Sequence, residues 1–151
     1  MPTVILITGA NRGLGRGLLQ RFLMEVDHIV IAANRNPDHP TSQELYSLPK
    51  AQGSRLIMVK LDILSEEDAF TAVESLQVVH GVNHLDVVIA NAGISSIWPT
   101  VATLRLTDLQ AHMDVNSYGV IRLYQATRSL LQMGSKEPMF VSMGSLAGCI
   151  G

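Results

Sequence analysis

The chain has 151 residues, the usual size of one domain, and such a chain can bury about two-thirds of its unfolded surface. Apolar residues make up 47% of it and charged residues 16%, which is typical of a packed globular protein and not of a disordered one. The net charge of −2 gives no reason to expect nucleic acid or an acidic membrane as a partner, and no apolar run reaches the roughly 18 residues of a membrane span. We expect one globular domain over residues 1–151.

The cysteine and histidine residues indicate which disulfides and metal sites the chain can form. The single cysteine, Cys149, cannot form an internal disulfide and suits a reducing compartment. The five histidines have no spacing typical of metal ligands. The apolar run after Met1 has no basic segment before it and leads into a glycine motif, so we interpret it as a strand and not as a signal peptide. These features predict a cytoplasmic protein without a metal site.

Short β-branched or apolar runs alternate with helical patterns along the chain. Nearly continuous Val, Ile and Leu within the runs indicates strands that are covered on both faces. Such alternation predicts an α/β fold, a Rossmann-type doubly wound parallel sheet of about five strands with right-handed crossovers. The predicted strands are Thr3–Thr8, His28–Ala33, Arg55–Leu61, Leu85–Asn91 and Met139–Ser142.

Three helices are expected between the first four strands. Thr41 stands three residues before Glu44, as in a capping box, and predicts the start of the short second helix. Ser65 can cap the third helix, because acidic residues follow it where the helix dipole favours them. The first helix is predicted from apolar residues that repeat every four positions. These residues are Leu14, Leu18, Phe22 and Val26.

A longer helix is expected from about Thr107 to Met133. Asn116 interrupts its apolar stripe, and a buried polar group needs hydrogen-bond partners. From the residues alone, a satisfied core asparagine next to Gly119 is the favoured explanation, and a specific functional use is the alternative. The stripe itself consists of Leu109, Met113, Val120, Leu123 and Leu130.

The turn after the first strand, residues Thr8–Gly15, is rich in glycine. Glycines here permit a sharp turn, a close approach of the backbone to a pyrophosphate, and close packing of the helix on the sheet. The helix that follows offers unpaired N–H groups to phosphates. A flexible loop without a ligand is the alternative, but the position between strand and helix favours a cofactor site.

The spacing of this turn, T-G-x-x-x-G-x-G, resembles that of the short-chain dehydrogenase/reductase family. Further landmarks of the family follow in order, namely Asp62-Ile63, Asn91-Ala92-Gly93, Asn116 and Gly144-Ser145, so that the resemblance covers the whole chain. Within the family, the chain resembles fungal ketoreductases of the norsolorinic acid ketoreductase type. The segments that carry this narrower resemblance are Thr8–Gly15, Ile31–Arg35 and Met113–Asn116.

The end of the second strand indicates which nicotinamide cofactor is bound. An NAD enzyme usually has an acidic residue there, but this strand ends in Asn34-Arg35. The Arg35 guanidinium suits a 2′-phosphate, and similar family members place a second basic residue where Arg12 stands. Two solvated surface arginines are the alternative; we expect NADP(H). The cofactor-binding residues that we expect are Gly9, Asn11, Arg12, Gly13, Leu14, Gly15, Asn34, Arg35, Asp62, Ile63, Asn91, Ala92 and Gly93.

The resemblance also implies a catalytic site. Ser145 corresponds to the serine that hydrogen-bonds the substrate carbonyl, and Asn116 to an asparagine at a helix irregularity that helps to order a proton-relay water. The family's acid is a tyrosine in a Y-x-x-x-K motif, about a dozen residues beyond this serine, where a lysine lowers the pKa of the tyrosine. The sequence ends at Gly151, so we expect a C-terminally truncated fold that lacks this pair.

Three functions follow from these expectations. The first is NADPH-dependent reduction of a small-molecule carbonyl, an aromatic or polyketide ketone, by hydride transfer from the nicotinamide. The second is a truncated, non-redox relative that keeps cofactor binding, or only the scaffold, for a regulatory, oligomer-forming or different catalytic role. An interaction domain without a nucleotide is the third and leaves the glycines and Arg35 unexplained. An open fifth strand and an exposed stripe on the long helix would favour a homo-oligomer.

Overall fold

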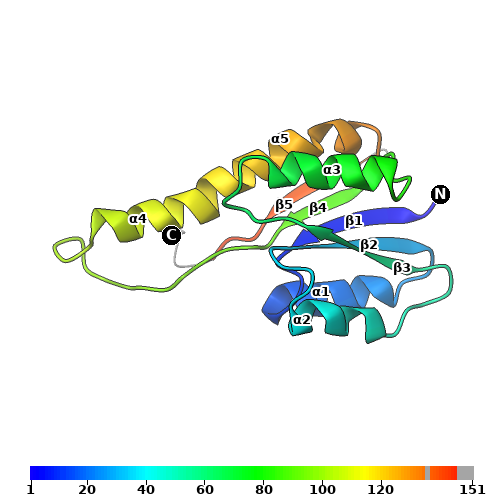
Figure 1. Ribbon diagram of the computed structural model, residues 1–151, viewed down its shortest axis with the longest axis horizontal. Coiled ribbons are helices and arrows are strands. Elements are labelled where there is room, and N and C mark those ends of the chain that lie inside the picture. Colours follow the sequence, from blue (N-terminus) through cyan, green and yellow to red (C-terminus); the bar gives the residue numbers. More distant parts are fainter. Residues whose placement is uncertain (135–136, 146–151) are drawn as a thin grey trace.

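The computed structural model describes residues 1–134 and 137–145; Cys149 lies outside them. A five-stranded parallel sheet lies between two helix layers, with α1 and α2 on one face and α3 and α5 on the other (Figure 1). The strands are β1 (Thr3–Thr8), β2 (His28–Asn34), β3 (Arg55–Lys60), β4 (Val87–Ala90) and β5 (Met139–Ser142). The helical segments are α1 (Gly13–Leu23), α2 (Pro40–Gln43), the 3₁₀ turn η1 (Glu44–Ser47), α3 (Asp68–Val78), α4 (Leu106–Met113), the π-helical turn η2 (Asp114–Tyr118) and α5 (Gly119–Gln132).

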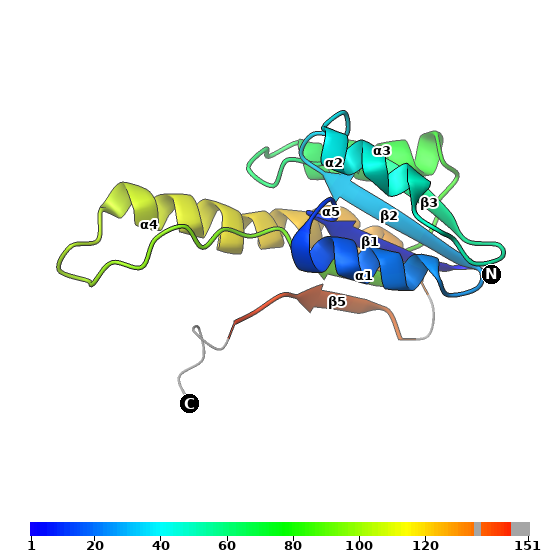
Figure 2. The same ribbon diagram turned by 90° about the horizontal axis from the view of Figure 1, so that it is seen from below.

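The sheet has the strand order β3-β2-β1-β4-β5, which confirms the predicted Rossmann-type fold. The chain builds outward from β1 in one direction through β2 and β3, and then in the other through β4 and β5. The order therefore reverses between β1 and β4, and the carboxyl ends of these two strands form the crevice where ligands bind in such sheets. β5 is the edge strand on this side (Figure 2).

Each face of the sheet packs against its own apolar core. Strands β1 and β2 are almost entirely buried, because consecutive apolar side chains point alternately into the two layers. One core includes Leu6 and Ile31 together with Leu76 of α3 and Leu123 of α5. The other lies beneath α1 and includes Ile5, Ile7, Leu19 and Leu23.

β4 is shorter than the predicted Leu85–Asn91 because its flanking residues bond elsewhere. The N–H of Leu85 donates to the carbonyl oxygen of Leu130 in α5 at 3.0 Å, and that of Asn91 donates to Ile89 within its own strand at 3.0 Å. Apolar character alone does not reveal these partners. The other four predicted strands agree with the structure to within one residue at each end.

The predicted apolar face of α1 is wrong in part. Leu14 is 73% exposed, and Val26 lies beyond the end of the helix and is 59% exposed. The buried residues of α1 are Gly15, Leu19 and Leu23. A strict four-residue repeat drifts around a helix of 3.6 residues per turn, so it cannot follow one buried face over four positions.

The two predicted helix caps have different outcomes. Ser65 is not the N-cap residue of α3, which is Glu67, but its hydroxyl does accept the N–H of Asp68, the first residue of that helix, at 3.1 Å. Thr41 does not cap α2: His39 is the N-cap residue, and its ring accepts the N–H of Thr41. The Thr41 hydroxyl bonds instead to Asn11 in the glycine turn.

The predicted long helix is present as α4, η2 and α5 in one continuous run. Its apolar stripe packs only in the second half: Leu123 and Leu130 are buried, whereas Leu109 is 43% and Met113 38% exposed. Figure 1 shows the reason, because α4 projects beyond the sheet while α5 lies across it. No helix within the described residues is long and apolar enough to cross a membrane.

Candidate functional site

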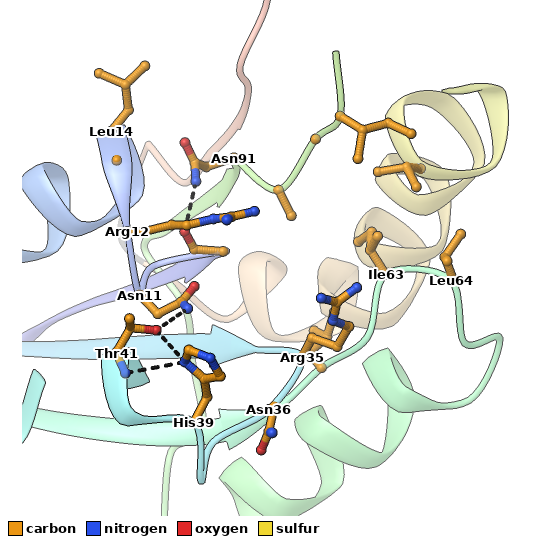
Figure 3. A pocket seen from close by; sticks show the side chains of 17 residues that line it. Asn11, Arg12, Leu14, Arg35, Asn36, His39, Thr41, Ile63, Leu64 and Asn91 are labelled. Carbon is orange, nitrogen blue, oxygen red and sulfur yellow. Dashed lines mark hydrogen bonds between the residues drawn. The ribbon is translucent and has the colours of Figure 1, made fainter. Parts of the chain in front are cut away.

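A cleft of about 530 Å³ opens at the carboxyl ends of β1, β2 and β4 (Figure 3). Its position matches the point where the strand order reverses. Most of the residues predicted from the sequence to bind the cofactor line it. These are Gly9, Asn11, Arg12, Gly13, Leu14, Arg35, Ile63, Asn91, Ala92 and Gly93.

The glycine turn leaves its backbone accessible from the cleft. Gly13 has a φ of +56°, which favours glycine, and a Cβ added there would meet no atom within 4 Å, so only open space lies above it. Gly15 faces the opposite way and is buried. A Cβ on Gly15 would overlap the carbonyl oxygen of Gly9 and the side-chain nitrogen of Asn91. The turn is therefore open towards the cleft and tightly packed towards the sheet.

Hydrogen bonds fasten the glycine turn to the end of β4. The Thr8 hydroxyl accepts the N–H groups of Asn91 and Ala92, each at 3.0 Å. The side-chain nitrogen of Asn91 donates to the carbonyl oxygens of Thr8 at 2.9 Å and of Gly9 at 3.2 Å. Thr8 was part of the predicted motif but had no predicted role. In the structure it is almost completely buried, and its hydroxyl accepts these two N–H groups.

Asn34 and Gly15 were expected to bind the cofactor but do not line the cleft. Asn34 is 1% exposed, and its side-chain oxygen accepts the N–H of Ala10 at 2.8 Å. Its side-chain nitrogen donates to the Ser42 hydroxyl at 3.2 Å. Asn34 thus connects Ala10 of the glycine turn with Ser42 of α2.

Asp62 also stands behind the cleft wall and not in it. Its carboxylate accepts the N–H of Leu64 at 3.0 Å, and its own N–H donates to the carboxylate of Asp68 at 3.0 Å. The Asp62 N–H, together with Ser65 and Lys60, lowers the pKa of Asp68 against the opposing effect of burial. This network holds the turn that presents Ile63 and Leu64 to the cleft.

Part of the cleft wall was missed by sequence reasoning. The residues concerned include several polar ones around the start of α2. The sequence there has no periodic pattern that would have predicted their position in the cleft. The unforeseen lining residues are Asn36, His39, Thr41, Leu61, Leu64 and Val115.

Two arginines give the cleft its charge. Figure 3 shows the Arg12 side chain reaching in from the glycine turn and that of Arg35 from the end of β2. Among the described residues that line the cleft, none is acidic. Guanidinium groups form strong, often bidentate hydrogen bonds with phosphate oxygens. The cleft therefore fits an anionic, phosphate-bearing ligand.

Asn116 lies in the π-helical turn η2, where the helix irregularity was expected. Its side chain is exposed, so the interpretation as a core asparagine is wrong. It makes two bonds with the loop after β4: its oxygen accepts the N–H of Ile94 at 2.9 Å, and its nitrogen donates to the Ile94 carbonyl oxygen at 2.8 Å. This clamp positions Ile94 at the cleft edge, opposite Val115 of the same helical turn.

The predicted catalytic groups are only partly brought together. Ser145 is exposed just beyond β5 and does not line the cleft. One Y-x-x-x-K spacing exists in the chain, from Tyr46 to Lys50, and was overlooked by sequence reasoning. It lies at η1, where the Lys50 ammonium donates to the carbonyl oxygen of Tyr46 at 2.8 Å, and neither residue lines the cleft. Within residues 1–134 and 137–145, no cluster of three metal-ligating side chains is found either.

The sheet order, the glycine turn and the cleft define a Rossmann-type α/β domain. The family profile described as short chain dehydrogenase matches residues 3–151. The chain belongs to the short-chain dehydrogenase family.

Individual relatives narrow the comparison. The chain is 48% identical over 145 residues to the norsolorinic acid ketoreductase stcE of Emericella nidulans, and 46% identical over 143 residues to a norsolorinic acid ketoreductase of Aspergillus parasiticus. These matches cover 95% of this chain but only 54% and 52% of the two relatives. The chain thus spans about half the length of these relatives, and the resemblance to fungal ketoreductases of this type is confirmed.

Solved structures show the same fold. An NADPH-bound carbonyl reductase from chicken fatty liver superposes with a TM-score of 0.86 at 26% identity, over 99% of this chain and 62% of the other. The putative carbonyl reductase Sniffer of Caenorhabditis elegans does so with a TM-score of 0.84 at 25% identity, over 99% and 66%.

Proposed function

We propose that this chain binds NADP(H) in the cleft, as the cofactor-binding part of a ketoreductase. One observation carries the proposal: Arg12 and Arg35 reach into a single cleft beside the glycine turn, and none of the described lining residues is acidic. A carboxylate at the end of β2 would accept hydrogen bonds from a ribose 2′-hydroxyl but would repel a 2′-phosphate. Because this chain has an arginine there instead, the cleft favours NADP(H) over NAD(H).

The lining residues divide the cleft into regions that suit the parts of this cofactor. The open backbone at Gly13 and the start of α1 suit the pyrophosphate. The apolar side chains of Ile63 and Leu64 suit the adenine ring, and the segment from Asn91 to Ile94 suits the nicotinamide end. When bound, the cofactor supplies a hydride to a carbonyl carbon.

Ketone reduction is proposed for the protein through its relatives, three of which are called norsolorinic acid ketoreductases. An aromatic or polyketide ketone is the substrate class that these names support. Ser145 is the proposed hydrogen-bond donor to the carbonyl oxygen, and Asn116 is proposed to position the loop that borders the nicotinamide end through its clamp on Ile94. A proton donor is also required, and none of the described lining residues is a tyrosine.

Binding is tested by titrating the 151-residue chain with NADPH and NADH and following the cofactor fluorescence. We expect NADPH to bind much more tightly than NADH. Failure of both to bind would overturn the proposal and favour a domain without a nucleotide. Equal binding of the two would remove the preference for NADP(H).

Redox activity needs a separate test, because a relative that keeps only cofactor binding would pass the first. The intact mass of the protein from its native source should exceed the 16.4 kDa of these 151 residues, and that protein should oxidise NADPH when an aromatic ketone is added. A mass of 16.4 kDa without ketone-dependent oxidation would favour the non-redox role.

We also propose that the chain self-associates. Apolar side chains are exposed along the long helix, at Leu106, Leu109 and Ile121 among others, and β5 leaves one sheet edge open. Exposed apolar surface of this kind commonly marks an interface, and a second copy of the chain is the partner that we propose.

A further inference from the structure

One wall of the cleft is built by the segment between β2 and α2, to which sequence reasoning gave no role beyond Arg35. Asn36 and His39 line the cleft from this segment, and Thr41 lines it from the first turn of α2. In Figure 3, His39 and Thr41 lie beside Asn11 of the glycine turn, on the same side of the cavity as Arg35. The wall therefore adds polar groups to the cleft that the two arginines also line.

This segment is fixed by its own hydrogen bonds. The Ser42 hydroxyl accepts from the side-chain nitrogen of Asn34 at 3.2 Å and donates to the carbonyl oxygen of Asn36 at 2.9 Å. The side-chain nitrogen of Gln43 donates to the carbonyl oxygen of Pro37 at 2.8 Å. A wall that is ordered before a ligand enters loses less conformational entropy on binding.

The hydrogen bonds around His39 favour one tautomer of its ring. Nδ1 accepts the N–H of Thr41 at 3.3 Å and lies 2.8 Å from the Thr41 hydroxyl oxygen. That hydroxyl in turn accepts from the side-chain nitrogen of Asn11 at 2.7 Å, which leaves its own proton for Nδ1. A nitrogen that accepts has no proton, so the neutral ring carries its proton on Nε2.

We propose that His39 is a specificity-determining residue for the cofactor, donating its Nε2–H to the 2′-phosphate held by Arg12 and Arg35. Thr41 and Asn11 are positioning residues, because they fix the ring and its tautomer. The inference rests on the proposed binding of NADP(H). The oxygens of a 2′-phosphate can accept more hydrogen bonds than two guanidinium groups donate to them. NAD(H) has no phosphate at this position and so does not need a third donor.

The test compares two variants of His39 with the unaltered chain. His39→Ala removes both the donor and the helix cap, whereas His39→Asn keeps a strong N-cap but is too short to donate from the Nε2 position. Both should raise the NADPH dissociation constant by about 10-fold or more, as expected for a lost bond to a charged group, and change that of NADH by less than about 2-fold. His80→Ala, outside the cleft lining, is the control and should change neither.

The positioning role of Thr41 has its own readout. Thr41→Val removes the hydroxyl that orients the ring and should weaken NADPH binding by about 3-fold or more, whereas Thr41→Ser should restore it. Thr71→Val, on an exposed turn of α3, is the matched control and should have no effect.

The titrations distinguish an error in the role of His39 from an error in the proposed cofactor binding. If the unaltered chain binds NADPH more tightly than NADH, but the His39 variants lose affinity for both equally or for neither, His39 does not contact the 2′-phosphate and the cofactor site stands. If the unaltered chain binds no nucleotide, the proposed function and the inference are both wrong. A loss of NADPH binding in Thr41→Ser as large as in Thr41→Val would overturn the positioning role.

Discussion

Arg35 follows β2 directly and lines the cleft, and in the proposed cofactor site it is the group expected to bind the 2′-phosphate of NADP(H). The Arg35→Asp substitution replaces a phosphate-binding group by one that repels phosphate and suits a ribose hydroxyl. We expect the affinity for NADPH to fall by about 100-fold, while that for NADH stays within about 3-fold or improves.

Parallel fluorescence titrations with the two cofactors measure this change. Arg55→Asp, at an exposed position of β3 outside the cleft lining, is a charge-matched control and should leave both affinities unchanged. Equal losses for NADPH and NADH in Arg35→Asp would exclude Arg35 from the 2′-phosphate site.

Gly15 and Gly17 form a matched pair within α1. A Cβ on Gly15 would overlap the carbonyl oxygen of Gly9, whereas a Cβ on Gly17 would meet nothing within 4 Å. Gly15→Ala should therefore lower the free energy of unfolding by about 1–3 kcal/mol, because backbone has to shift. Gly17→Ala should raise it by about 0.5–1 kcal/mol, because alanine is the better helix former.

Urea unfolding of the two variants checks this pair. A Gly15→Ala protein as stable as the unaltered chain would show that the turn does not pack against Gly9 and Asn91 as described. The sequence motif predicted close packing and an open backbone face in this turn, with Gly13 on the open face, and the structure places the close packing at Gly15. That assignment depends on the orientation of each residue in the folded turn.

At the scale of elements, Asp68 links the start of α3 to the turn after β3. Its carboxylate accepts the Asp62 N–H at 3.0 Å, lies 3.2 Å from the Lys60 ammonium and is 17% exposed. The Asp62 N–H is the largest cause of its lowered pKa, followed among the favourable contacts by Ser65 and Lys60. A folded pKa below the ordinary 3.8 means that ionised Asp68 stabilises the fold fully above about pH 4, and that this stabilisation is lost as the pH falls through the lowered value.

Asp68→Asn should accordingly lower the free energy of unfolding by about 1 kcal/mol at pH 7 and have a much smaller effect at an acidic pH low enough to protonate the native carboxyl as well. Urea unfolding at both pH values measures the difference. Asp38→Asn, at an exposed loop carboxylate, is the control and should change stability at neither pH. The same loss at both pH values would show that the charge of Asp68 is not what stabilises the turn.

Local sequence signals predicted some elements well and others poorly. The strands were recovered because continuous β-branched runs are a local signal that burial on both faces requires. The hydrogen bond of Ser65 to the start of α3 was also a local signal, since its partner Asp68 is three residues away. Thr41 was misassigned because its decisive partner, Asn11, lies 30 positions earlier in the chain. The polar wall beside Arg35 was missed for the same reason, because its shape depends on bonds to the glycine turn and to β2 that no local pattern encodes.

For the whole molecule, the long helix raises the question of what covers its first half. None of the residues of α4 is buried, and Leu106 and Leu109 are 79% and 43% exposed. Beyond η2, by contrast, Leu123 and Leu130 of α5 are fully or almost fully buried. The apolar stripe was read correctly from the sequence, but its period could not tell which half meets the sheet, because that depends on the length of the strands beneath.

If a second copy covers this helix, association should depend on its apolar residues. We expect sedimentation equilibrium to show a concentration-dependent oligomer for the unaltered chain, and Leu109→Lys to weaken association by about 10-fold or more, because a charge would be buried in the contact. Thr107→Lys, at an exposed polar position of the same helix, is the matched control for added charge and should weaken association much less. A chain that stays monomeric at all concentrations would show that a second copy is not the partner. A Leu109→Lys variant that associates normally would show that the interface lies elsewhere, and the open edge of β5 would be the next surface to alter.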